Sequence, residues 1–268
     1  MKKLLLASLI TATSFGASAS VLTFDDTSFG GSGNVSLYGI DFDDAVSSVT
    51  QSDGPGGSGD ITGTDNFSEF GDALAVSFDD GSVLPVAIDP AYEVFYQYAF
   101  TGMATLVPSG IAGIPASIFV SFNVGTSNLF VETLGGNAAD GILNGTNASV
   151  ASLSLASGSC SISTGTESGG CELDLDVNFA SGLFFDTNGD DLALNNTVKA
   201  TLNLTAEEVN PTFNYQADPN NPGQFLPQTF DIIHDGNLSF SYDVPEPASI
   251  AILGLGLLGF AGARRRKA

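Results

Sequence analysis

Positive charge is almost missing from the interior of this 268-residue chain. Of the seven basic residues, two lie at the N-terminus and four near the C-terminus, which leaves Lys199 as the one base in residues 20–247. The same stretch holds all 30 acidic residues, so its formal net charge is −29. Without a basic patch it cannot neutralise phosphates, which argues against nucleic-acid binding, and without arginine it lacks a guanidinium clamp for phosphorylated ligands.

Histidine, cysteine and tryptophan are also scarce. There is one histidine, His234, there are two cysteines, and there is no tryptophan. His234 is the single histidine candidate for a general base, but no nucleophile is evident, so we interpret it as a structural or surface residue. Two cysteines are too few for a zinc site or a cysteine-rich scaffold. We therefore expect no enzymatic activity and no required cofactor, although the abundant carboxylates leave glycoside hydrolysis open.

The N-terminal residues have the pattern of a secretory signal. Lys2 and Lys3 precede an apolar run, and Ala17-Ser18-Ala19 places small residues at positions −3 and −1 of a cleavage site after Ala19. We expect export with loss of residues 1–19, which leaves an acidic domain over residues 20–244 and a C-terminal segment over residues 245–268.

That C-terminal segment has three parts. Pro245-Glu246-Pro247 is followed by the apolar residues 248–263 and then by Arg264-Arg265-Arg266-Lys267. A helix over the apolar part would be roughly 24 Å long, shorter than the roughly 30 Å hydrocarbon core of a bilayer. The basic cluster should stay cytoplasmic, with the acidic domain outside. The pattern predicts a short hydrophobic helix that holds the chain transiently in the inner membrane; a plain single-pass anchor is the alternative.

The stretch from Pro245 to Lys267 resembles the PEP-CTERM sorting signal at nearly every position. The resemblance implies an exported substrate of an exosortase, which acts at the Pro-Glu-Pro region, in a Gram-negative bacterium that also makes exopolysaccharide. The same tail has been labelled an ice-binding protein C-terminal domain, although it carries no ice-binding chemistry. In length, acidity, composition and the segment Gly71–Gly102, the rest of the chain is similar to flocculation-associated PEP-CTERM proteins.

The resemblance also implies a role and partners. The expected protein is a structural or adhesion protein of the cell surface or extracellular matrix, in biofilms or flocs. Its partners would be the processing enzyme and exopolysaccharide or other matrix components. A secreted carbohydrate-binding module or glycan-acting hydrolase is the alternative.

Residues 20–244 contain short runs in which apolar and polar residues alternate. In Cys171–Phe179 the apolar residues occupy every second position, which is typical of a half-buried antiparallel strand. The other runs that predict strands are Val35–Phe42, Ala73–Phe78, Val83–Ile88, Tyr92–Val107, Ala116–Val124, Asn128–Thr133, Ser149–Leu155, Val198–Ala206 and Asn237–Val244. Turn-forming clusters separate them, so we predict an all-β fold: an antiparallel β-sandwich, jelly-roll-like. A β-solenoid is the rival, but we find no repeat of fixed period.

Cys160 and Cys171 flank a stretch rich in serine, threonine and glycine. In an exported protein with two cysteines, we predict that they form a disulfide. A reactive thiol is the alternative, but no histidine or lysine lies nearby in the sequence to activate it.

Acidic clusters follow aromatic residues at four places. Phe-Asp-Asp begins at Phe24, Phe42 and Phe78, and the cluster 186–191 follows Phe184-Phe185. A core aromatic followed by carboxylates suits a turn, and the same oxygens suit Ca²⁺.

The last of these clusters is the strongest candidate for a metal site. Asp186, Asn188 and Asp190 have the spacing of the start of a calcium loop. Asp191 and Thr197 stand where the EF-hand pattern has glycine and glutamate. Turn-forming acids are our first interpretation, and a Ca²⁺ site at Asp186, Asn188 and Asp190 is the alternative.

The segment Tyr92–Phe100 is the most aromatic of the chain. Its aromatic residues would share one face of a strand. We predict core packing, with a sugar-stacking face as the alternative.

Overall fold

The computed structural model describes the strands and most of their connections. The described residues are 21–53, 65–107, 109–111, 116–135, 137, 139–143, 146–163, 165–166, 168–195, 198–207, 216–219 and 225–242. Their strands are β1 (Leu22–Asp25), β2 (Asn34–Leu37), β3 (Gly39–Ser52), β4 (Asp65–Asp79), β5 (Val86–Ala87), β6 (Tyr92–Val107), β7 (Ser117–Thr133), β8 (Thr146–Ser163), β9 (Ser168–Phe179), β10 (Phe184–Phe185), β11 (Val198–Glu207) and β12 (Gln228–Tyr242). Two short helices, η1 (Thr27–Phe29) and α1 (Leu192–Asn195), join some of them.

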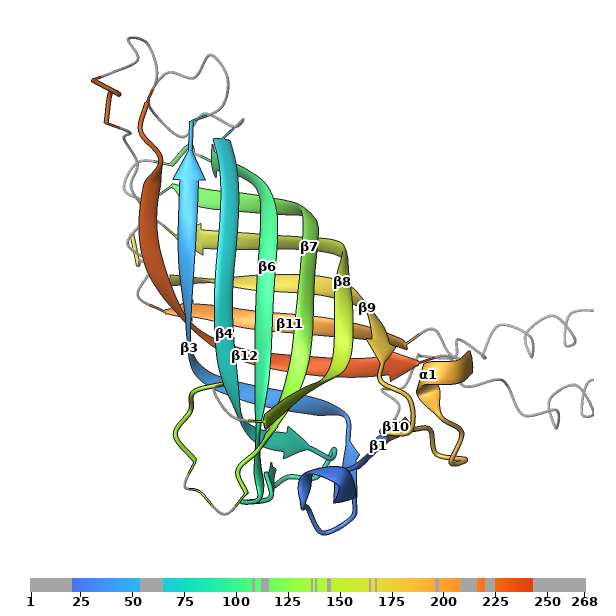
Figure 1. The fold of residues 1–268 in the computed structure, drawn as a ribbon. Helices are drawn as coiled ribbons and strands as arrows, with labels where there is room; N and C mark the ends of the chain where they lie inside the picture. The colour runs from blue at the N-terminus through green and yellow to red at the C-terminus, as the bar shows by residue number, and fades with distance from the viewer. Residues whose placement is uncertain are drawn as a thin grey trace, which may run out of the picture.

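One large antiparallel sheet forms the body. Its strand order is β3-β12-β11-β9-β8-β7-β6-β4-β5, and β3 pairs with β4 as well as with β12, so the sheet closes on itself. Figure 1 shows β3, β4, β6, β7 and β8 on one side, with β9, β11 and β12 crossing behind them. The two sides pack across a common core as the layers of a sandwich do, which confirms the all-β, antiparallel sandwich prediction.

The connectivity corrects the jelly-roll-like detail of that prediction. Along β6, β7, β8, β9, β11 and β12, each strand pairs with the next long strand in the chain. Such nearest-neighbour pairing is a meander, which short connections between antiparallel strands favour, whereas a jelly roll needs longer crossings.

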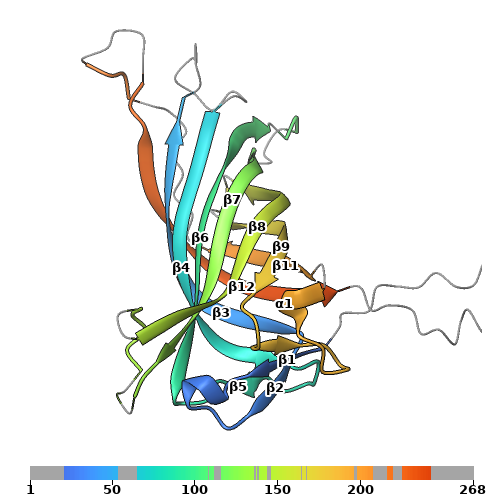
Figure 2. The same ribbon diagram turned by 45° about the vertical axis from the view of Figure 1, so that its right-hand side comes forward.

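A small second sheet covers one end of the body. Its strand order is β10-β1-β2, and Figure 2 shows it below the large sheet. Leu22 and Phe24 of β1 and Phe184 of β10 are buried there. The rings of Phe24 and Phe184 stack with their centroids 4.9 Å apart. These contacts seal the lower end of the core against water.

Inside the closed sheet, aromatic rings form a continuous column. Starting from Phe42, the column runs through Tyr96, Tyr98 and Phe100 to Phe122, with neighbouring ring centroids 5.4–5.8 Å apart. Each of these rings is at most 5% exposed. Their burial is the main apolar contribution to stability along this side of the core.

Several predicted strands have other bounds in the structure. Ala116–Val124 and Asn128–Thr133 are parts of one strand, β7, and β4 begins at Asp65 rather than Ala73. The predicted strand Val83–Ile88 shrinks to the two residues of β5, because Val83 is 99% and Leu84 76% exposed and neither packs on the core.

Candidate functional site

The loop after β10 holds the predicted calcium ligands, and its first carboxylate is surrounded by donors. Asp186 Oδ1 accepts hydrogen bonds from the backbone N–H groups of Asn188 (2.8 Å) and Asp190 (2.9 Å), and its Oδ2 accepts one from the Asn188 side-chain amide (3.1 Å). Burial acts to raise the pKa of Asp186, but the hydrogen bonds outweigh it and the pKa lies below its usual value. Asp186 thus builds the turn.

Asp191 has a similar structural role at the end of the same loop. Its Oδ2 accepts hydrogen bonds from the hydroxyl of Ser181 and the N–H of Gly182, both 2.8 Å, and its Oδ1 accepts one from the N–H of Ala193 at 3.0 Å. Burial again opposes these bonds, yet the pKa of Asp191 is lowered. The carboxylate therefore ties the turn between β9 and β10 to the first turn of α1.

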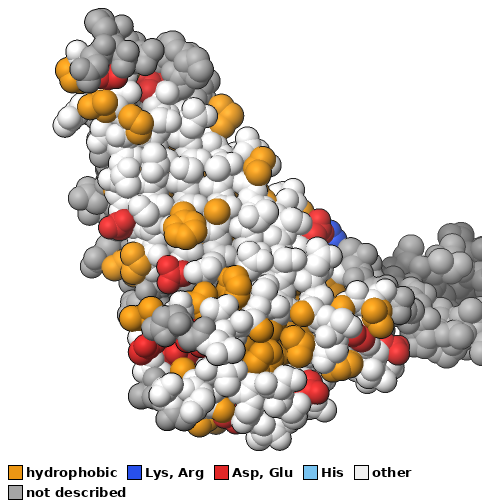
Figure 3. All heavy atoms as spheres, viewed as in Figure 1, with side chains coloured by type: hydrophobic (Ala, Val, Ile, Leu, Met, Phe, Trp, Pro, Cys, Tyr) orange, Lys and Arg blue, Asp and Glu red, His pale blue; other side chains and the backbone are white. Residues whose placement is uncertain are grey.

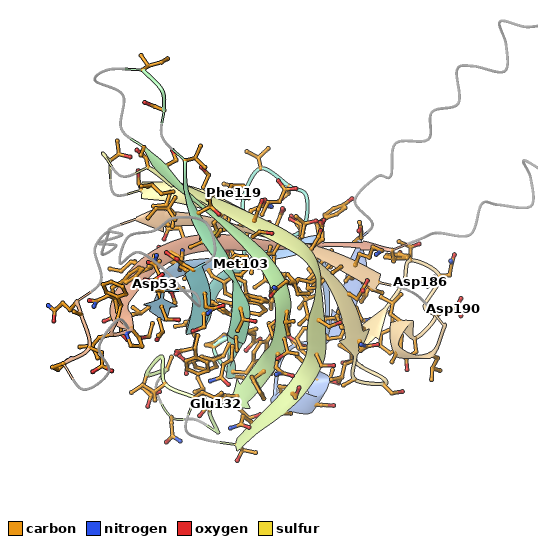
Figure 4. All side chains as sticks on the ribbon, turned by 90° about the horizontal axis from the view of Figure 1, so that it is seen from above. Asp53, Met103, Phe119, Glu132, Asp186 and Asp190 are labelled. Carbon is orange, nitrogen blue, oxygen red and sulfur yellow. A yellow bond between two sulfur atoms is a disulfide. The ribbon has the colours of Figure 1, made fainter. Side chains whose placement is uncertain are left out.

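Figure 4 shows Asp186 and Asp190 on this loop at one end of the molecule. A shallow groove beside it is lined by the loop and by β1 and β2, including Thr23, Asp25 and Asn34. Among the described residues no group of three or more His, Cys, Asp or Glu side chains could hold a metal ion. A Ca²⁺ site at Asp186, Asn188 and Asp190 would need the asparagine oxygen as well, and it stays a prediction.

The acids of the first and third Phe-Asp-Asp motifs form turns, whereas Phe42-Asp43-Asp44 lies within β3 beside a bulge, which corrects the turn interpretation for that motif. Asp25 Oδ1 accepts hydrogen bonds from the N–H and hydroxyl of Thr27, and these bonds lower the pKa of Asp25. Asp79 and Asp80 each accept one from the backbone N–H two residues later. Asp26 is fully buried and accepts from the N–H of Gly33 and the hydroxyl of Tyr92. This agrees with the interpretation of these acids as turn-forming.

The aromatic segment of β6 packs inside the sheet. Tyr92, Val94, Tyr96, Tyr98 and Phe100 are each at most 2% exposed. The prediction of core packing is therefore confirmed, and the sugar-stacking alternative for this face is wrong, since no sugar could reach these rings.

His234 lies at the centre of a buried polar cluster. Its Nε2 is 3.1 Å from Ser47 Oγ and 2.8 Å from Glu69 Oε1, and the Tyr98 hydroxyl donates to the same Glu69 oxygen at 3.3 Å. Burial, followed by the charge of Glu69, raises the pKa of Tyr98 well above its usual value. All four residues are at most 3% exposed. The histidine is thus a buried residue of the core.

The cluster lacks the arrangement of a Ser-His-acid triad. In a triad the serine contacts one ring nitrogen and the acid holds the other. Here Ser47 and Glu69 both contact Nε2, while Nδ1 has no hydrogen-bond partner among the described residues. The sequence pointed to neither partner, because Ser47 and Glu69 lie 187 and 165 residues from His234. Their inward positions in the alternation of β3 and β4 are the only signal.

Three further acids, Asp65, Glu93 and Glu132, are buried, although no sequence pattern indicated it. Glu93 and Glu132 are directly opposite each other on β6 and β7, and they are 6% and 3% exposed. They lie on the outer face of the sheet, where the loop after β7 reaches Glu93: the N–H of Gly141 donates to Glu93 Oε1 at 3.0 Å. This contact fastens the loop to the sheet.

The predicted disulfide is present. Cys160 of β8 and Cys171 of β9 face each other directly in the antiparallel register and are bonded, with their Cα atoms 4.0 Å apart. The described residues contain no free cysteine, so the reactive-thiol alternative is wrong.

The outward faces of the long strands carry mainly hydroxyl, amide and carboxylate groups. One row crosses four strands through Thr229, Thr50, Ser68 and Thr101, which are paired in register. On the opposite side Lys199, the one base of the domain, forms an exposed ion pair with Asp176 at 3.2 Å. Figure 3 shows one face with few charged side chains, on which hydrophobic side chains are scattered over the upper part and gather over the lower part.

The sorting segment is identified by comparison with known families. Residues 243–267 match the PEP-CTERM protein-sorting motif, so the chain carries this motif where the sequence predicted it. The motif marks an exported protein that an exosortase-type enzyme processes and that passes through a membrane-anchored sorting intermediate. No curated protein and no solved structure matches the chain.

The residues predicted to take part in sorting lie outside the described part of the structure. They are Ala19, Pro245, Glu246, Pro247, Arg264, Arg265 and Arg266. Within the described residues, no helix has the length and apolar character needed to cross a membrane.

Proposed function

We propose that the domain is a non-enzymatic structural or adhesion module of the cell surface or extracellular matrix. In this role it associates with exopolysaccharide in biofilms or flocs after the tail has been processed. The proposal joins the sorting motif at residues 243–267 to the nature of the outer surface.

The observation that carries it is the separation of inner and outer side chains. The histidine, serine and glutamate that could support chemistry are enclosed in the core, and the exposed strand faces offer hydroxyl, amide and carboxylate groups. Such groups exchange hydrogen bonds with sugar hydroxyls and bind divalent cations between acidic polymers. The hydrolase alternative would have to use a pair of carboxylates, because the one histidine, His234, is 1% exposed.

The processing part is tested by intact mass spectrometry of protein exported by its native host. We expect the loss of residues before Ser20 and of residues after about Glu246 or Pro247. Extracellular molecules that mostly retain Arg264–Lys267 would contradict release by the sorting enzyme.

The adhesion part is tested by two experiments. One deletes the gene and measures cell aggregation, and the other measures how strongly the purified wild-type protein is retained on purified exopolysaccharide. We expect weaker aggregation, restored by the wild-type gene, and retention on the polymer without release of soluble sugar. Release of oligosaccharides by the purified protein would favour the hydrolase alternative instead.

A further inference from the structure

A groove on the outer face of the large sheet has no part in the turns and clusters described above. It has a volume of about 350 Å³ and crosses β3, β4, β6 and β7. Its walls carry four hydroxyls, two amides and one thioether, contributed by Thr50, Ser52, Ser68, Thr101, Asn66, Asn123 and Met103. All the side chains that line it are uncharged.

A β-bulge places one of the amides. Thr101 pairs with Val124 and Gly102 with Phe122, so Asn123 is an extra residue in β7 without a partner in β6. A bulge turns the side chain of its extra residue away from the regular alternation. Asn123 is exposed and lines the groove together with Thr101, its neighbour across the strand pair. The amide is therefore positioned by the backbone itself.

Apolar side chains accompany these polar groups. Met103 is 40% exposed within the groove, Val124 is 64% exposed opposite Thr101, and Phe70 is 60% exposed two positions beyond Ser68 on β4. Figure 4 shows Met103 on this part of the sheet. Exposed apolar surface beside hydroxyls and amides matches a sugar ring, which has an apolar face and hydroxyls at its edge.

The charge of the protein decides which polymer fits. Residues 20–247 have a formal net charge of −29, so the protein repels an acidic polymer over most of its surface. The groove offers neither a basic side chain to hold an acidic sugar nor a carboxylate to hold a cation that could bridge to one. We propose that this groove binds a neutral polysaccharide chain; the inference rests on the proposed association with exopolysaccharide and identifies its site and its ligand class.

The test uses the exported wild-type protein and the host's own exopolysaccharide, separated by anion exchange into a neutral and an acidic fraction. Affinity electrophoresis through gels that contain either fraction measures binding. We expect the neutral fraction to retard the wild-type protein more strongly than the acidic one. Asn123→Ala and Thr101→Val should each weaken neutral-polymer binding by roughly five- to tenfold, the loss expected for about one hydrogen bond.

Asn203→Ala and Thr205→Val are matched controls, because both residues are exposed on β11, away from the groove. They should bind as the wild-type protein does, and the melting temperature of every variant checks its fold. Thr101→Val preserves side-chain volume, so it keeps the test valid if Asn123→Ala disturbs the bulge.

Two results would overturn the groove proposal and leave the proposed function standing. One is retention of the groove variants equal to wild type, and the other is stronger retardation by the acidic fraction. If neither fraction retards the wild-type protein, the association with exopolysaccharide fails together with the groove.

Discussion

Gly71 of β4 makes room for the buried polar cluster, and Gly71→Ala tests this directly. In the register Gly71 lies between Ser47 on β3 and Tyr98 on β6. A methyl group built at this position would lie 2.8 Å from Ser47 Cβ and from the Cζ and hydroxyl oxygen of Tyr98. Carbon atoms pack best at about 3.5–4.0 Å, so the Tyr98 ring would have to move away from Glu69.

The expected cost follows from these contacts. Overpacking costs about 1–3 kcal/mol, and losing the bond between Tyr98 and Glu69 adds about 0.5–1.5 kcal/mol. Alanine restricts the unfolded chain and returns about 0.4–1 kcal/mol. We therefore expect Gly71→Ala to lower the free energy of unfolding by about 0.5–4 kcal/mol.

Gly170→Ala in β9 is the matched control. Its new methyl group would meet just one atom within 4 Å, the Leu204 carbonyl oxygen at 3.6 Å, so we expect it to be neutral or slightly stabilising. Urea unfolding of both variants, followed by far-ultraviolet circular dichroism because the chain has no tryptophan, gives the two free energies. Equal midpoints for Gly71→Ala and Gly170→Ala would refute the claim that Tyr98 and Ser47 enclose this position.

The other predictions concern the disulfide and the acidic loop. Replacing Cys160 and Cys171 by alanine should cost about 2–3 kcal/mol, measured by urea unfolding, and an unchanged midpoint would contradict this. Asp191→Asn should lower stability at neutral pH by about 0.5–1.5 kcal/mol, because one carboxylate oxygen becomes an amide nitrogen that cannot accept a hydrogen bond. The pKa values of Asp186 and Asp191 in the folded protein lie below their usual value of 3.8, so both carboxylates stabilise the fold above that pH. This stabilisation is lost as the pH falls through the folded-state pKa values. Melting temperatures measured down an acid series should therefore fall less steeply for Asp191→Asn than for the wild-type protein. Millimolar Ca²⁺ should raise the melting temperature more than NaCl of equal ionic strength, and the double variant Asp186→Asn with Asp190→Asn should remove this difference. Equal shifts in both salts would show that the ions act by charge screening and not by binding at this loop.

Alternation along single strands predicted the all-β fold because burial on one face imposes a period of two on the sequence. Leu173, Leu175, Val177 and Phe179 of β9 are all buried, as their positions indicated. The closure of the sheet could not be predicted in this way. Period two shows which side of a strand faces the core, but it does not identify the neighbouring strand, and the pairing of β3 with β12 joins residues such as Gly39 and Ser239.

The same limit explains what was missed in the core. His234 was visible as a lone histidine, but its environment depends on β3 and β4, which reach it only after closure. Gly71 looked like an ordinary strand glycine until the register placed Tyr98 beside it. Local features were more predictable: the turn-forming role of Asp25 and Asp186 depends on residues two to four positions away.

The order of strands along the chain also bears on sorting. β12 is the strand that closes the sheet, since it pairs with β11 on one side and with β3 on the other. It ends at Tyr242, and the sorting motif begins at residue 243. Every described residue that pairs in the closed sheet therefore precedes the motif. β3 gains its second partner only when β12 is in place, so closure of the sheet depends on the strand that directly precedes the motif. Closure pairs β3 on both sides, so this long strand presents no unpaired edge of the kind that promotes aggregation.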